Sequence, residues 1–78
     1  MTDIHLSTAR KIMQHGEFSL SWLTQSGEQR HADRAVSLKY DFATGTRTIK
    51  ILFDDQPPKI KRIRDVLITG INDVEVYV

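Results

Sequence analysis

The chain has 78 residues, 40% of them hydrophobic and 27% charged, and its eleven Lys and Arg against ten Asp and Glu give a net charge of +1. This length allows one domain at most, and the composition excludes a disordered tail or a collagen-like repeat. The absence of cysteine excludes disulfides, thiolate metal sites and a Cys nucleophile, and the small net charge excludes a global field that attracts nucleic acid or membrane.

The sequence indicates no membrane segment and no targeting segment. Its longest apolar runs, residues 51–53 and 66–68, have three residues each, far fewer than the ~20 that span a bilayer. The N-terminal MTDIH does not have the basic and then apolar order of a signal peptide. We therefore expect a cytoplasmic protein.

The first predicted element is a helix over residues 3–15. Its apolar residues recur at the spacing that lines one helical face: Ala9, Ile12 and Met13. Asp3 or Ser7 can accept a hydrogen bond from a backbone N–H group of the first turn. Gly16 is the residue type that commonly ends a helix in the left-handed conformation.

After the helix the apolar period changes to two, which predicts strands. Phe18, Leu20 and Trp22 alternate with serines, so residues 18–24 form a half-buried strand. A turn at Ser26-Gly27 follows. Residues 30–42 are expected to form a second strand whose first half is polar and contains a bulge or loop.

A hairpin is predicted around Thr44-Gly45, with its second strand over residues 46–53. With those two residues as the loop, Tyr40 faces Ile49 and Phe42 faces Arg47. One face of the hairpin then carries almost all of its apolar residues, interrupted by Arg47: Val36, Leu38, Tyr40, Phe42, Ile49, Ile51 and Phe53. A slip of one residue would mix the two faces, so the pattern selects this register.

The last third of the chain is predicted to hold a short strand and a second hairpin. Pro57 and Pro58 end the preceding strand because proline cannot donate to a ladder. Residues 60–64 are compatible with a short strand or a helical turn. Strands over residues 66–71 and 74–78 meet at Asn72-Asp73, two residues that tolerate the positive φ of a tight turn.

Together these elements predict an α+β fold. One N-terminal helix packs on a five- or six-stranded antiparallel meander, which is either an open sheet or a small open β-barrel. The pattern is compatible with both forms.

The chain shows no signature of an enzyme, so we expect no catalytic, cofactor-binding or metal-binding residue. His5, His15 and His31 do not have the spacing of metal ligands. Asp54-Asp55, the adjacent carboxylate pair, precedes two prolines and is interpreted as a solvated turn. A chain of this size also has little room for a water-excluding pocket.

The most distinctive charge feature is a basic run before the C-terminal hairpin. It consists of Lys59, Lys61, Arg62 and Arg64. The predicted register places Lys39 and Lys50 opposite one another on the polar sheet face, and these six residues together would form a patch that holds phosphates. The alternative is that the run is a solvated edge that prevents aggregation.

A second candidate surface lies on the C-terminal hairpin. The predicted register places Ile68, Glu75 and Tyr77 on the face opposite the valines, and exposed tyrosine is common at interfaces. An apolar hairpin at a sheet edge also favours pairing with a second copy or with a partner strand. We therefore expect a protein partner or a homo-oligomer.

Two resemblances accompany these patterns. The layout of the chain resembles short phage and mobile-element proteins of anaerobic gut bacteria, through Gly16, Phe18, Arg64, Asn72, Glu75, Val76 and Tyr77. That resemblance implies an accessory or virion-associated binding protein without a catalytic site. The order of a helix and then strands is similar in topology to Sm-like RNA-binding barrels, although Thr69 stands where an RNA-contacting Arg is expected.

The function predicted from the sequence is a small, non-enzymatic protein-binding or accessory module that contacts its partners through the C-terminal hairpin. The alternative is a nucleic-acid-binding accessory domain that uses the basic patch. The two hypotheses differ in where the basic side chains lie. Gathering on one exposed concave face favours nucleic acid. Scattering, or pairing with Asp54, Asp55, Asp65 and Glu75, favours the protein-binding module.

Overall fold

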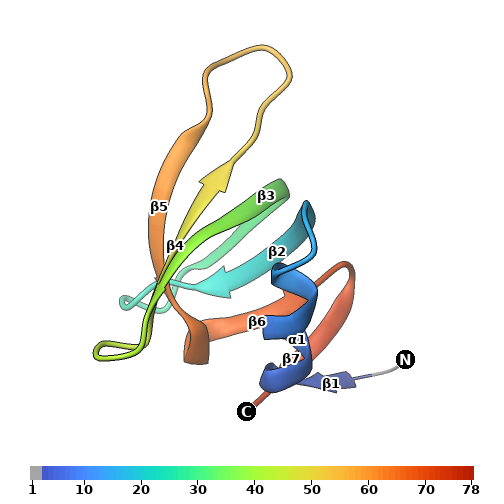
Figure 1. Cartoon of the computed structure of the whole chain (residues 1–78), viewed down its shortest axis with the longest axis vertical. Helices are drawn as coiled ribbons and strands as arrows, with labels where there is room; N and C mark the ends of the chain where they lie inside the picture. The colour runs from blue at the N-terminus through green and yellow to red at the C-terminus, as the bar shows by residue number, and fades with distance from the viewer. Residues whose placement is uncertain (1–2) are drawn as a thin grey trace.

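The computed structural model describes residues 3–78, which form one short helix and a seven-stranded sheet (Figure 1). In chain order the elements are β1 (Asp3–His5), α1 (Leu6–Met13), β2 (Phe18–Leu23), β3 (Gln29–Asp41), β4 (Thr46–Ile51), β5 (Lys59–Arg64), the 3₁₀ helix η1 (Asp65–Leu67), β6 (Ile68–Ile71) and β7 (Val74–Tyr77). The predicted α+β class is therefore right.

The sheet is mixed and is not closed into a barrel. Its strand order is β1-β7-β6-β2-β3-β4-β5, so β1 and β5 are the two edges. All neighbouring strands are antiparallel except β1 and β7, which are parallel. The expectation of five or six purely antiparallel strands was wrong in this respect. The loop between β4 and β5 projects away from the rest of the molecule (Figure 1).

The N-terminal segment departs from the predicted helix. Its first described residues form β1, where Ile4 pairs with Val76 at the other end of the chain. The helix begins at Leu6, and the His5 side chain caps it by accepting a hydrogen bond from the Ser7 backbone N–H at 3.1 Å. Gly16 has the predicted positive φ, +116°. The helix is shorter because pairing with β7 holds residues 3–5 extended.

The core lies between α1 and the inner face of the sheet. It contains Leu6, Ala9, Met13, Phe18, Leu20, Trp22, Ala32, Ala35, Ile49, Ile51, Ile63, Ile68 and Ile71. The helix contributes the 9 and 13 positions of its apolar stripe, and β2 contributes its alternating apolar residues, as the sequence predicts. Within residues 3–78, no helix has the length and apolar character needed to cross a membrane.

The hairpin of β3 and β4 has a different register from the predicted one. Tyr40 pairs with Arg47, and a bulge between Ser37 and Lys39 shifts the register along the strand. The turn starts early because the Asp41 carboxylate accepts a hydrogen bond from the Ala43 N–H at 2.9 Å, an Asx turn. The loop therefore covers residues 42–45 rather than Thr44-Gly45 alone.

This register exposes side chains that the sequence placed in the core. Phe42 lies in the loop with 89% of its surface exposed, and Leu38 lies at the bulge with 53% exposed. The inward positions of β3 are filled by small residues, Ala32 and Ala35, which leave room for the side chains of β2 and β4. Tyr40 and Ile49 remain on one face, as predicted, but as partners of Arg47 and Ser37.

The C-terminal hairpin confirms the predicted turn. Ile71 pairs with Val74 and Gly70 with Glu75 across Asn72-Asp73, whose φ angles are +49° and +66°. Positive φ at both loop residues matches the twist of the flanking strands, and Asn and Asp tolerate it better than other side chains do. The segment before β6, however, is the 3₁₀ helix η1 and not a strand from residue 66.

Candidate functional site

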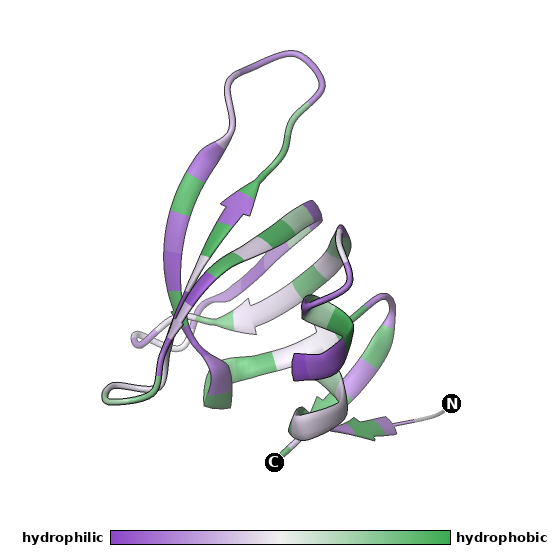
Figure 2. Cartoon of the chain, in the orientation of Figure 1, coloured by the Kyte–Doolittle hydropathy of each residue, from purple (hydrophilic) through white to green (hydrophobic). Residues whose placement is uncertain are grey.

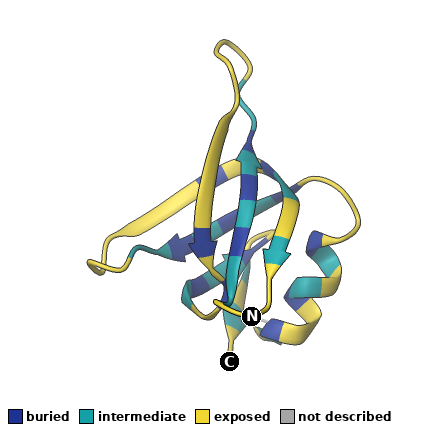
Figure 3. Ribbon diagram, turned by 60° about the vertical axis from the view of Figure 1, so that its left-hand side comes forward, coloured by how far each residue is buried: buried dark blue, intermediate teal, exposed yellow. Residues whose placement is uncertain are grey.

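The basic run forms an edge strand of the sheet. Lys59, Lys61, Arg62 and Arg64 are all exposed residues of β5, which pairs with β4 along its whole length. Figure 2 shows β5 as mainly hydrophilic, and Figure 3 shows it largely exposed. Ile63 is the residue of this strand that is buried in the core. Of the two forms that the sequence left open for this segment, the structure has the strand, and it presents the four cations at a sheet edge.

Lys39 and Lys50 lie on the neighbouring strands but do not face one another. Lys39 pairs with Thr48, and Lys50 pairs with Val36, because the register of β3 and β4 is shifted from the predicted one. Thr48 pairs in turn with Arg62, so a row of side chains crosses the three strands. A hollow of about 170 Å³ lies along this row, between Lys39 and Arg62. The predicted patch of six is thus spread over the edge strand and this outer face.

A larger hollow, of about 410 Å³, lies between β5 and the turn that joins β2 to β3. We name it the basic hollow. Its lining consists of Trp22, Leu23, Thr24, Gln25, Arg30, Thr46, Lys61, Arg62, Ile63, Arg64 and Leu67. Four of these side chains are cationic and none is acidic. The lining of the basic hollow therefore combines four cationic side chains with the apolar side chains of Trp22, Leu23, Ile63 and Leu67.

The cations of the basic run have no carboxylate partner among residues 3–78. The ion pairs within residues 3–78 are Arg10–Asp65, Arg30–Glu28, His31–Asp33, Arg34–Asp54 and Arg47–Asp65. None of the six residues of the predicted basic patch is among them. Their charge is consequently available to an external anion. The six residues therefore satisfy the nucleic-acid criterion in lacking carboxylate partners, but not in position, because they are spread over more than one face.

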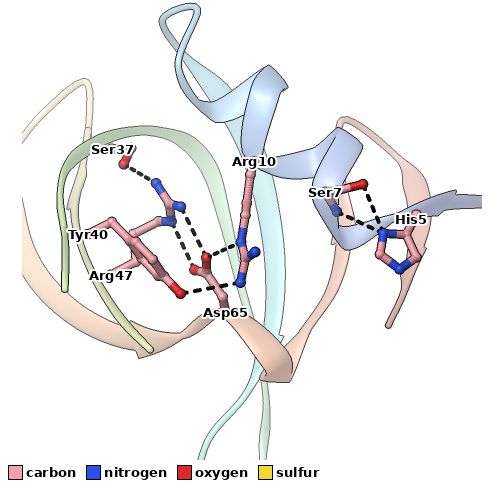
Figure 4. A network of polar contacts seen from close by, with 7 residues as sticks. All are labelled: His5, Ser7, Arg10, Ser37, Tyr40, Arg47 and Asp65. Atoms are coloured by element: carbon pink, nitrogen blue, oxygen red, sulfur yellow. Dashed lines mark hydrogen bonds and ion pairs between the residues drawn. The ribbon is translucent and has the colours of Figure 1, made fainter. Parts of the chain in front are cut away.

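A second polar cluster is buried beneath α1 and contains two more arginines (Figure 4). Arg47 of β4 donates from Nε to Asp65 Oδ1 at 2.9 Å and from Nη2 to Oδ2 at 3.0 Å. Arg10 of α1 donates from Nε to the same Oδ2 at 3.0 Å. The Asp65 side chain is 1% exposed, so this carboxylate is held between two guanidinium groups away from solvent.

Tyr40 and Ser37 complete this buried cluster. The Tyr40 ring lies 4.8 Å from the Arg47 guanidinium carbon and 5.3 Å from that of Arg10, and its hydroxyl accepts a hydrogen bond from Arg10 Nη2 at 3.3 Å. Ser37 Oγ accepts from Arg47 Nη1 at 2.7 Å. Each of the three guanidinium nitrogens of Arg47 thereby donates one hydrogen bond. The cluster joins α1, β3, β4 and η1, and its contacts are structural.

Sequence reasoning missed this cluster. Two features of the sequence pointed toward it. Arg47 interrupts the apolar face of its hairpin, and Asp65 directly follows the basic run. A charged residue on a buried face needs a partner, and the nearby tyrosine on the same face was a candidate. Asp65 is 18 residues further along the chain from Arg47 and 55 from Arg10, so the pairing itself has no local signal.

The three residues of the predicted protein interface do not share a surface. Ile68 is 3% exposed and belongs to the core, because a bulge between β2 and β6 turns it to the same face as Ile71. Glu75 is exposed beside a shallow hollow that Asp73 also lines. Tyr77 is 54% exposed, and its ring meets His5 edge-on at 5.3 Å. The edge of β7 is moreover covered by β1.

The histidines lie apart from one another. His5 caps α1, and His31 lies between Ser21 Oγ at 2.7 Å and Asp33 Oδ1 at 3.1 Å. Over residues 3–78, no three His, Cys, Asp or Glu side chains gather in a group that could hold a metal ion. Asp54 is engaged by Arg34 Nη2 at 2.9 Å in the exposed loop after β4.

Comparison with known proteins gave no match. No family model matches the chain, and neither a curated protein nor a solved structure matches it.

Proposed function

We propose that this protein is a non-enzymatic module that binds the phosphate backbone of nucleic acid along β5. The observation that carries the proposal is the basic run itself: Lys59, Lys61, Arg62 and Arg64 are exposed on one edge strand and have no carboxylate partner within residues 3–78. Three of the four also line a hollow that has no acidic side chain.

The physical basis is the release of counterions from the nucleic acid. Each phosphate that a Lys or Arg neutralises frees condensed cations, so binding is favoured at low salt and weakens as salt is added. For a single strand, the logarithm of the binding constant falls with the logarithm of salt by about 0.7 per phosphate contact. Four contacts on β5 therefore predict a slope of about −3. The small net charge of the whole chain does not prevent this, because the field is local.

Charge reversal on β5 tests the proposal. We expect Arg62→Glu to weaken binding of a labelled oligonucleotide of about 16 nucleotides by at least tenfold, measured by fluorescence anisotropy at low salt. Lys11→Glu is the matched control, since Lys11 is an exposed cation of α1 that does not line the hollow and forms no ion pair within residues 3–78. Absence of binding by the unmodified protein, or equal losses in the two variants, would refute the proposal.

A protein-binding role of the C-terminal hairpin is the second candidate. It is supported by the exposure of Tyr77 (54%) and Val78 (72%) at the end of β7. If this hairpin joins two copies, the molar mass from light scattering rises with protein concentration, and Tyr77→Ser lowers it to that of one chain. A mass that stays at one chain over the accessible concentrations would contradict self-association.

A further inference from the structure

The basic hollow suggests which form of nucleic acid is bound, an inference that rests on the proposed function. We infer that a single strand enters the hollow between β5 and the β2–β3 turn. Arg30 then contacts a phosphate from the side of the hollow that lies opposite β5. Trp22 and Leu67 lie beside a base. The sequence assigned none of these three residues to a site.

The hollow is lined by the central strands β2 and β3 on one side and by the edge strand β5 on the other. Trp22 and Arg30 are register partners on β2 and β3, so their side chains lie on the same face, opposite the cations of β5. The volume of about 410 Å³ falls within the range of about 300–1,000 Å³ that is common for small-ligand pockets. The Trp22 side chain lines the hollow but is only 6% exposed, so it does not project into the open space.

The main chain of β5 also borders the hollow. Residues 61–64 all line it, although successive side chains of a strand point to opposite faces. The hollow therefore lies against the edge of the strand. An edge strand has N–H and C=O groups that no neighbouring strand uses. Such groups can pair with the polar edges of an unstacked base, which a duplex keeps inside.

The charge of the lining favours an anionic occupant such as a phosphate. Arg30, Lys61, Arg62 and Arg64 surround the hollow, and the described lining contains no carboxylate. Arg30 does pair with Glu28 at 3.2 Å, but the two side chains are 55% and 61% exposed. A pair this exposed is weak, so a phosphate can replace Glu28.

The surrounding shape disfavours a duplex. A protein that reads duplex DNA in the major groove inserts a helix or a two-stranded ribbon. The projecting ribbon of this fold is the β4–β5 hairpin, and its loop carries Asp54 and Asp55, which phosphates repel. An extended acidic peptide is the other anion that an edge strand accommodates, and the test includes it.

Two arginines on β3 provide a matched test. Arg30 and Arg34 are both exposed and each holds one surface carboxylate, but only Arg30 is part of the hollow lining. We expect Arg30→Ala to weaken binding of the single-stranded oligonucleotide by about fivefold to tenfold, the loss of one charge-assisted contact. Arg34→Ala should change it less than twofold, and the matching duplex should respond equally to both variants.

Trp22 supplies a second readout because it is the single tryptophan of the chain. Saturation with the unlabelled single strand should change its fluorescence emission, whereas the duplex should leave it unchanged. Equal effects of the two arginine variants together with unchanged emission would overturn this inference. Binding that still depends on Arg62 would then leave the proposed function standing.

The remaining outcomes are equally decisive. If polyglutamate displaces the oligonucleotide at equal charge concentration and shifts the Trp22 emission in the same way, the occupant is an acidic peptide and the inference is wrong. If no oligonucleotide binds at all, the proposed function fails first, and this inference fails with it.

Discussion

Two groups of arginines in this small protein have opposite surroundings. Arg10 and Arg47 converge on Asp65 beneath α1, where the carboxylate is 1% exposed. Arg62 and Arg64 lie on the exposed edge of β5 and have no carboxylate partner among residues 3–78. The chemistry of the four guanidinium groups is the same.

The two groups differ in whether their charge and their hydrogen-bond donors are already engaged within the protein. A buried guanidinium must be neutralised and fully hydrogen-bonded, because an unpaired charge away from water is costly. Its hydrogen-bond donors are then engaged by partners inside the protein. An exposed guanidinium is solvated, contributes little to stability, and keeps its donors free for a ligand. The buried Arg47, together with the half-buried Arg10, therefore stabilises the fold through Asp65, whereas the donors of the edge arginines remain unused within residues 3–78.

The largest expected effect is the loss of the shared carboxylate. Asp65→Asn leaves Arg47, which is 5% exposed, without a counter-charge, and breaking a buried pair in this way costs about 3–5 kcal/mol. We expect the midpoint of urea unfolding to fall sharply. Asp54→Asn is the control, because Asp54 is 93% exposed in its pair with Arg34, and should cost at most about 1 kcal/mol. Equal midpoints would mean that the cluster does not stabilise the fold.

A smaller change sharpens the comparison within the cluster. Tyr40→Phe removes the hydroxyl that accepts from Arg10 Nη2 at 3.3 Å but keeps the ring against both guanidinium groups. We expect a loss of about 0.5–1.5 kcal/mol in the free energy of unfolding, the contribution of one hydrogen bond. Tyr40→Ala should cost more because the ring is lost as well. A similar cost for the two variants would show that the ring contacts are unimportant.

The smallest expected effect on stability is at the edge. Arg62→Ala and Arg64→Ala remove solvated charges from β5, so the free energy of unfolding should stay within about 0.5 kcal/mol of that of the unmodified protein. Their thermal midpoints should barely change, while their affinity for the oligonucleotide falls. A marked loss of stability in either variant would show that the edge arginines are structural and would remove the contrast with the buried pair.

Local sequence signals predicted the C-terminal turn well. Asn72-Asp73 lies between two alternating apolar segments, and both residues adopt the positive φ that the turn requires. The basic run itself is evident in the sequence, but its pattern left a short strand and a helical turn equally possible, and the structure shows the strand β5. Each of these features depends on a few adjacent residues.

The long strand β3 could not be predicted in the same way. Its bulge between Ser37 and Lys39, and its early turn at Asp41, shift the faces of the strand. A bulge of one residue moves the following side chains to the other face. The predicted register had no bulge at this point, and it therefore placed Phe42 in the core. The sequence pattern cannot place a bulge because both registers pair apolar residues somewhere along the strand.

Local patterns in the amino-acid sequence specify the α+β class, the helix stripe, the tight C-terminal turn and the cluster of four cations within residues 59–64. These follow from side-chain period and turn chemistry, which are local. The tertiary structure alone decided which arginines are neutralised, that β1 covers β7 in parallel, and that Arg30 and Trp22 face the basic strand across a hollow. Those relations join residues far apart in the chain, and folding is what brings them within reach of one another.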